Sequence, residues 1–334
     1  EAINALSCGA EGVKFIFTTR IVALANNYSA VRVDLLSDRE GGELILKRAK
    51  LPEAQRADCE AIVRQLGGLT LAISIAAAKI DKGKMTAAAY LDHLRQTEDL
   101  RSQLTLSNPR HPFARKRSDQ TDESMANDNF EASLNLTYGE LDDELQRCFR
   151  MLGVFAPDST FDAVAMAAVW AMPPESAQEA LEVLVDLELV QQAENGRYSQ
   201  HSLLRAYARA LSAADELQAA AARHAEHYRA RMRAADDSQT YYTMRDELPQ
   251  LRAAFAWAEQ TEQPDLAQNI LDNTANLLQM LNLGEEYLNW ANRLVALVER
   301  RGGDLGAALT IRGNAYRAAA RVVIGEDRRA RLLA

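Results

Sequence analysis

The chain has 334 residues, of which 48% are hydrophobic and 25% charged, so it is long enough for two or three domains that each bury a core. Its formal net charge of −9 argues against a nucleic-acid or membrane-surface partner, because phosphate binding needs a local excess of Lys and Arg. The cysteines Cys8, Cys59 and Cys148 are too few and too widely spaced for a disulfide framework, which points to the reducing cytoplasm. The longest apolar runs are also too short to cross a bilayer.

Residues 1–34 contain one strand pattern that ends on polar residues. The continuous apolar run at 15–17 is typical of a strand covered on both faces in a parallel sheet. Open α/β sheets bind ligands beyond the carboxyl ends of their strands, so Arg20 at this strand end is a candidate for contacting a terminal phosphate. An Arg20 paired with a nearby carboxylate is the structural alternative. Since one strand cannot fold alone, we expect the rest of an α/β core, including its phosphate loop, to precede Glu1.

Residues 35–100 predict a compact helical domain. Apolar residues recur at intervals of three and four over 52–66, and Gly67 ends that helix. The next stretch, 69–80, is almost wholly apolar and rich in Ala, which predicts a helix buried in a small bundle. Residues 101–129 have few apolar side chains and mixed charges, which is the composition of a linker.

Residues 130–210 predict a winged helix-turn-helix domain. Helical patterns occupy 140–153, 161–171 and 176–187. Two short strand patterns follow, joined by Asn195-Gly196, and Asn-Gly between short strands is a strong hairpin signal. His201 comes directly after the second strand and before an amphipathic helix, where an imidazole N–H can reach an anion. A histidine that bonds only to its own backbone is the alternative at that position.

Residues 211–334 predict helical repeats. Small and bulky apolar residues alternate at helical spacing, which suits helical hairpins of the tetratricopeptide kind, although no 34-residue period is clear. Stacked hairpins present a concave surface to a protein partner or ligand, and we expect the array to continue beyond Ala334. The predicted fold class is therefore mainly α: an α/β remnant, a helical domain, a winged helix and repeats.

Three short segments together resemble motifs of the NB-ARC family of signalling ATPases. The strand end Phe17-Thr18-Thr19-Arg20 is similar to the family's first sensor, and Gly68-Leu69-Thr70-Leu71 to its Gly-Leu-Pro-Leu motif. Gln200-His201-Ser202 is similar to the Met-His-Asp motif that ends the winged helix. Thr70 replaces the proline that packs on the adenine in the family, and Ser202 replaces the acid beside the switch histidine.

The resemblance implies a bacterial signalling switch that binds ADP or ATP. Thr19, Arg20, Leu69, Thr70 and His201 would contact the nucleotide, and Mg²⁺ is expected only with the upstream phosphate loop. ADP bridging the core and the winged helix through His201 would hold the protein closed, and Arg20 would sense the γ-phosphate of ATP. A partner on the repeats would open the molecule and lead to homo-oligomerisation. The chain alone is expected not to hydrolyse ATP.

Two other function classes are open to a chain of this kind. A winged helix can bind DNA, but the candidate recognition helix at 175–189 has five acidic residues and no Lys or Arg, which opposes contact with phosphates. The repeats could serve a protein-interaction module without any nucleotide. That second reading does not explain the Thr-Thr-Arg strand end or the wing followed by His201.

Overall fold

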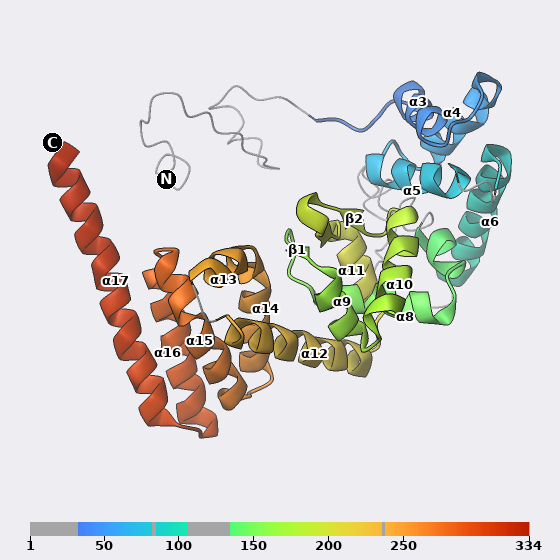
Figure 1. Cartoon of the computed structure of the whole chain (residues 1–334). Helices are drawn as coiled ribbons and strands as arrows, with labels where there is room; N and C mark the ends of the chain where they lie inside the picture. The colour runs from blue at the N-terminus through green and yellow to red at the C-terminus, as the bar shows by residue number, and fades with distance from the viewer. Residues whose placement is uncertain (1–32, 82–84, 106–133, 236–237, 334) are drawn as a thin grey trace.

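A computed structural model describes residues 33–81, 85–105, 134–235 and 238–333. Helices dominate this part of the chain, which confirms the predicted mainly α fold (Figure 1). The predicted strand end with Thr19 and Arg20 lies outside the described residues. Among the helices that are described, none has both the length and the apolar character needed to cross a membrane.

The first described unit is a small bundle of helices. It contains α3 (Asp38–Arg48), the 3-10 turn η1 (Glu53–Gln55), α4 (Arg56–Gln65), α5 (Thr70–Asp81) and α6 (Ala87–Thr105). Its core side chains, including Ile45, Ile62, Ile73 and Tyr90, are fully buried. α6 continues to Thr105, past the point at which the sequence predicted a linker to begin.

The turn between α4 and α5 depends on two consecutive glycines. Gly67 and Gly68 have φ angles of 63° and 71°, a left-handed backbone that residues with a Cβ seldom adopt. The carbonyl of Gly68 also accepts a hydrogen bond of 2.9 Å from the Leu36 N–H, and a Cβ on Gly68 would clash with the Leu36 carbonyl oxygen. The backbone of this turn is thereby fixed at the start of α5.

The second unit has the order of a winged helix. It contains α8 (Asp143–Met151), η2 (Leu152–Val154), β1 (Thr160–Phe161), α9 (Ala163–Trp170), α10 (Pro174–Asp186), β2 (Gln191–Gln192), η3 (Glu194–Gly196), β3 (Tyr198–Ser199) and α11 (Ser202–Leu211). The strands form an antiparallel sheet in the order β1-β3-β2. At the hairpin turn, Asn195 and Gly196 have φ angles of 57° and 69°, as a tight turn between twisted strands requires.

Strand β1 is a difference from the sequence-based prediction. Phe161 was expected to begin a helix, but it lies in β1 opposite Tyr198. Its ring stacks on that of Phe155 at 4.1 Å between centroids, so the packing of two aromatic side chains decides the conformation there. The helix begins after Asp162, whose carboxylate accepts a 2.9 Å hydrogen bond from the Ala165 N–H as an N-cap.

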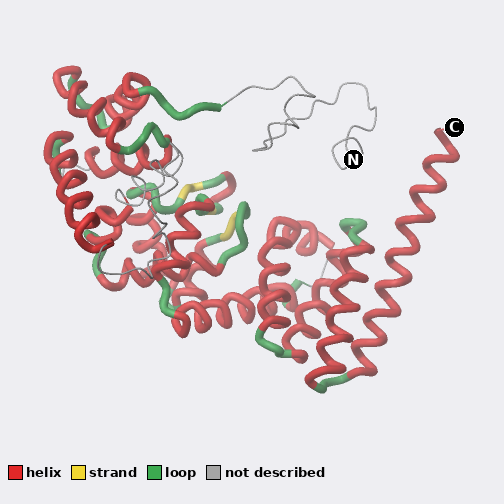
Figure 2. Tube along the Cα trace, turned by 180° about the vertical axis from the view of Figure 1, so that it is seen from behind, coloured by secondary structure: helices red, strands yellow, loops and turns green. Residues whose placement is uncertain are grey.

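Most of the remaining helices lie side by side in an extended array, and α12 runs across to it from the second unit (Figures 1 and 2). They are α12 (Ala214–Arg233), α13 (Ser238–Thr243), the 3-10 turn η4 (Met244–Glu247), α14 (Leu248–Gln260), α15 (Pro264–Met280), α16 (Gly284–Arg301) and α17 (Leu305–Leu333). Helices α14 and α16 are joined by the ion pairs Arg252–Glu286 and Arg293–Glu259. Each of these pairs links residues 34 positions apart, a spacing that the sequence pattern alone did not reveal.

Ion pairs also join the first two units. Arg48 of α3 pairs with Glu188, which follows α10. Lys79 of α5 is 4% exposed; its Nζ lies 2.7 Å from the Glu140 carboxylate and donates to the Leu136 carbonyl at 3.2 Å. A lysine this deeply buried is stable only with such partners, so the α5 helix is anchored to the segment that precedes α8.

The buried His224 of α12 gives the fold an expected pH dependence. Its Nε2 lies 2.9 Å from Oε1 of Gln250, and burial lowers its pKa from 6.5 to about 4. In the unfolded chain this histidine takes up a proton near pH 6.5. In the folded chain it does so only near pH 4, because burial lowers its pKa. The free energy of unfolding should therefore fall by about 3 kcal/mol as the pH drops through this window.

Urea unfolding at a series of pH values measures this effect. A His224→Gln variant should lose this part of the pH dependence, and the exposed His93 provides a matched control as His93→Gln. An unchanged pH profile in His224→Gln would show that His224 is not the group responsible.

Candidate functional site

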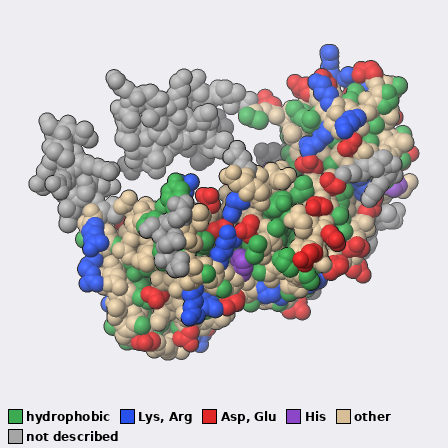
Figure 3. All heavy atoms as spheres, in the orientation of Figure 1, with side chains coloured by type: hydrophobic (Ala, Val, Ile, Leu, Met, Phe, Trp, Pro, Cys, Tyr) green, Lys and Arg blue, Asp and Glu red, His purple; other side chains and the backbone are tan. Residues whose placement is uncertain are grey.

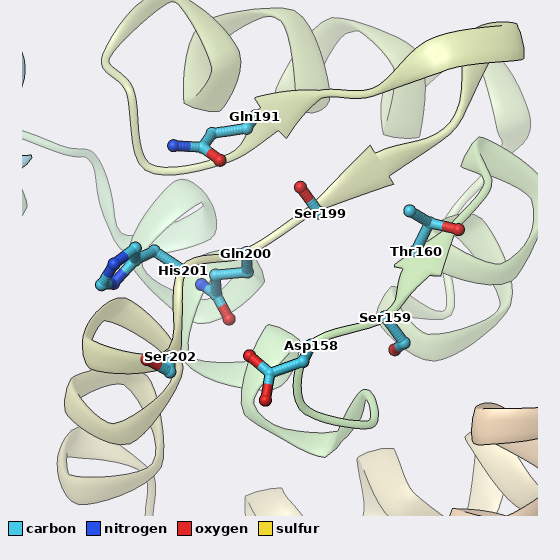
Figure 4. A pocket seen from close by; sticks show the side chains of 8 residues that line it. All are labelled: Asp158, Ser159, Thr160, Gln191, Ser199, Gln200, His201 and Ser202. Atoms are coloured by element: carbon cyan, nitrogen blue, oxygen red, sulfur yellow. The ribbon is translucent and has the colours of Figure 1, made fainter. Parts of the chain in front are cut away.

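A cavity of about 340 Å³ lies where the hairpin meets α11 (Figure 4). Its walls are Asp158 and Ser159 of the preceding loop, Thr160 of β1, Gln191 of β2 and the segment 199–202. This volume falls within the range of about 300–1,000 Å³ that small-molecule sites occupy. The cavity therefore gives the strand-to-helix junction at His201 a space in which a ligand fits.

His201 is the N-cap residue of α11. Its Nδ1 accepts a 3.2 Å hydrogen bond from the Leu203 N–H, so the ring proton of the neutral imidazole is on Nε2. Among the described residues, Nε2 has no hydrogen-bond partner. Partial burial lowers the pKa of His201 and outweighs the opposing effect of Asp158, so the ring is neutral at pH 7 and offers one N–H donor.

Gln200 is the second notable side chain of the cavity. It is only 8% exposed, and neither its amide nitrogen nor its amide oxygen has a hydrogen-bond partner among the described residues. In Figure 4 the carboxamide points toward the side of the cavity that carries Asp158. Buried side-chain amides are normally hydrogen-bonded, so this one has an unused donor and an unused acceptor beside the cavity.

The lining of the cavity is polar and carries one carboxylate. Asp158 adopts the left-handed backbone conformation, with φ of 50°, and contributes the acidic group. Of the described residues that line the cavity, none is Lys or Arg; the others are His201 and side chains with hydroxyl or amide groups. The cavity itself therefore suits a neutral polar ligand group, and the ring of His201 points away from Asp158 (Figure 4).

One wall of the cavity is held by a residue of the helical array. Gln250 of α14 is fully buried, and its Oε1 accepts the Ala156 N–H at 3.0 Å. Its Nε2 donates to Ser159 Oγ at 2.8 Å and to the Thr160 carbonyl at 3.2 Å. This one amide thereby fixes the backbone on both sides of Asp158.

A buried ion-pair cluster makes a second connection to the same wall. Arg197, which precedes β3, donates to Thr160 Oγ1 at 2.6 Å and to the Thr160 carbonyl at 2.9 Å. Its guanidinium also binds the Glu247 carboxylate at 2.5 Å, and that side chain is 1% exposed. Arg231 of α12 reaches the same carboxylate at 3.2 Å and Asp162 at 2.5 Å. One charged network thus connects the β2–β3 hairpin, β1 and the helical array.

Most of these residues carry no recognisable signal in the sequence. Arg197, Glu247 and Gln250 were not assigned to the site, because the contacts that connect them to the cavity wall span 37 to 94 positions of the sequence. Asp158 had no motif around it. The only local signal was the position of Gln200 directly before His201.

The predicted nucleotide contacts fall in separate places. Leu69 is half-buried before α5, and Thr70 is exposed as the first residue of that helix. Neither lines the cavity, and within the described part of the chain no hydrogen bond or ion pair joins either one to His201. Thr19 and Arg20 lie outside the described residues. The structure thus groups His201 with Gln200 and Asp158, and does not bring Leu69 and Thr70 into the same cavity.

Other chemistries find little support in the described residues. They contain no group of three or more His, Cys, Asp or Glu side chains that could hold a metal ion. Burial raises the pKa of the Cys59 thiol to about 11 and that of the Cys148 thiol to about 12, so both stay protonated and unreactive.

The charge distribution bears on a nucleic-acid partner. The acidic side chains of α10 are all exposed: Glu175, Glu179, Glu182 and Asp186. On the face shown in Figure 3, basic side chains occur in small groups among acidic ones. The helix that would enter a DNA groove therefore presents negative charge to the phosphates.

The chain is similar to two bacterial proteins, both described as the regulatory protein AfsR. It is 32% identical over 219 residues to that of Streptomyces griseus and 30% identical over 218 residues to that of Streptomyces coelicolor, matching 64% and 62% of this chain. These matches cover 20% and 19% of the relatives, so the chain spans about a fifth of their length. A search of known protein families finds no match. The similarity supports kinship with bacterial regulators.

Proposed function

We propose that the chain is part of a bacterial regulator controlled by ADP and ATP, in which His201 binds a phosphate of ADP in the closed state. One observation carries the proposal: Nδ1 of His201 caps α11, so Nε2–H projects from the junction as an uncommitted donor. The similarity to AfsR regulatory proteins supports a signalling role.

The surroundings of His201 favour an anion on the side away from Asp158. His201 stands at the N-terminus of α11, a helix of ten residues, where backbone N–H groups and the helix dipole attract negative charge. The hydrogen bond from Nε2–H to a phosphate oxygen is worth about 1.5–3 kcal/mol. Thr19, Arg20, Leu69 and Thr70 complete the nucleotide contacts in this proposal, after closure of the units around ADP, and Mg²⁺ accompanies the phosphate loop.

The helical array is the sensing part in the same proposal. A protein partner or ligand bound to the tetratricopeptide-like helices shifts the equilibrium toward the open form, and homo-oligomerisation follows. Glu247 at the end of η4 and Gln250 in α14 hold the wall of the cavity, so a movement of the array would reach the nucleotide site through them.

Two substitutions in the protein at its natural length test the proposal. His201→Ala should speed ADP dissociation by about ten- to a hundredfold, since it removes the phosphate contact. Arg20→Ala should leave ADP binding intact and abolish activation by ATP, because it removes only the γ-phosphate contact. Stopped-flow release of a fluorescent ADP measures the first effect.

The matched control is His93→Ala, which alters an exposed histidine on α6. It should leave ADP dissociation unchanged. If His201→Ala and Arg20→Ala instead lower thermal stability by similar amounts and leave nucleotide exchange unaltered, neither residue belongs to a switch.

A further inference from the structure

We infer that the cavity beside His201 binds the sugar of the nucleotide and that Gln200 and Asp158 recognise its hydroxyl groups. This inference rests on the proposed function and adds a site for a neutral diol to it. No lining residue was assigned such a role from the sequence. The unpartnered amide of Gln200, the charge of the lining and the position of His201 support it.

The amide of Gln200 requires a ligand that both donates and accepts. Its Nε2 and Oε1 are buried and unpartnered among the described residues, and leaving such groups unsatisfied costs about 1–3 kcal/mol each. A hydroxyl group is a donor and an acceptor at once, so a pair of hydroxyls can satisfy both ends of the amide. An apolar ligand group could satisfy neither.

Asp158 selects among polar ligands. Its carboxylate only accepts hydrogen bonds, and its negative charge repels phosphate from this cavity. Acidic side chains recognise the ribose of dinucleotides through its hydroxyls in the same way. A cation is less well matched, because the lining offers it one carboxylate among neutral groups.

The positions of Gln200 and His201 allow both side chains to bind neighbouring parts of one ligand. Gln200 and His201 are consecutive, and in Figure 4 the amide points toward Asp158 while the imidazole points away from it. A nucleoside diphosphate has its sugar directly beside its phosphates. It can therefore place the diol between Gln200 and Asp158 and a phosphate oxygen on His201 Nε2.

The test compares ADP with 2′,3′-dideoxy-ADP by calorimetry on the protein at its natural length. Wild type should bind ADP about tenfold or more tightly than the dideoxy analogue, because two hydrogen-bonding hydroxyls are lost. Gln200→Leu and Asp158→Asn should both weaken ADP binding and bring the two affinities close together. Asn tolerates the left-handed backbone at 158, so that variant removes the charge and keeps the shape.

The matched control is Gln192→Leu, an exposed glutamine on β2 outside the cavity. It should retain the full preference for ADP. If wild type binds both nucleotides equally, the sugar subsite is wrong and the proposed function stands. If Gln200→Leu weakens the binding of inorganic phosphate, the cavity binds phosphate and the sugar subsite is again wrong. If wild type binds no ADP at all, the proposed function fails and the subsite fails with it.

Discussion

Replacing Arg197 with Met is expected to lower the free energy of unfolding by about 3–5 kcal/mol, the cost of leaving a buried charge without its partner. The Glu247 side chain is 1% exposed and lies 2.5 Å from the Arg197 guanidinium. Among the described residues, only Arg231, at 3.2 Å, would then compensate the Glu247 charge. Thr160 would also lose both hydrogen bonds from Arg197. Urea unfolding monitored by circular dichroism measures the loss.

Arg252→Met is the matched control for this prediction. Arg252 also binds a glutamate, Glu286, through a bidentate contact at 2.7 Å, but its side chain is 46% exposed. Exposed pairs contribute about 0–1 kcal/mol, so the control should stay within that range. Equal losses in the two variants would mean that burial of Glu247 does not decide the strength of the pair.

Replacing Gln250 with Leu is expected to destabilise the protein by about 3 kcal/mol or more, because buried donors lose their acceptor. The substitution conserves size but leaves the Ala156 N–H and the His224 Nε2–H without their acceptor, Oε1 of Gln250. It also frees the loop around Asp158, since Ser159 and Thr160 lose their contacts with the amide. Hydrogen exchange of the Ala156 amide should accelerate together with the loss of stability.

The control for Gln250→Leu is Gln260→Leu, at an exposed position of the same helix α14. Surface changes of this kind lie within about 0.5 kcal/mol of wild type. A double variant carrying Arg197→Met and Gln250→Leu should show a loss that differs from the sum, because both side chains bind the Thr160 carbonyl. Strict additivity would show that the two residues act independently on the loop.

The elements that follow from local chemistry were the predictable ones. The apolar stretch 69–80 became α5, and the Asn195-Gly196 turn lies between β2 and β3, because periodicity and positive φ are encoded by neighbouring residues. Strand β1 was not predictable in this way. It has two residues, and its conformation depends on pairing with Tyr198, far along the chain.

The residues of the candidate site also differ in whether neighbouring residues made them predictable. His201 could be placed at a strand-to-helix junction because the residues on both sides of it carry local signals. Gln250 could not be assigned to the site, since its role depends on backbone groups 90 to 94 positions away. Leu69 and Thr70 were grouped with His201 through motif order alone, and the fold leaves them outside the cavity.

The two ion pairs between α14 and α16 have a consequence for how this region can change during evolution. Arg252–Glu286 and Arg293–Glu259 both span 34 positions, and each helix supplies one arginine and one glutamate. Because α14 carries Arg252 and Glu259 where α16 carries Glu286 and Arg293, an exact 34-residue duplication would place like charges opposite one another. A change of a few residues would turn one helical face away from the next and separate all of these charges at once. The order of the charges therefore specifies which helix can lie beside which.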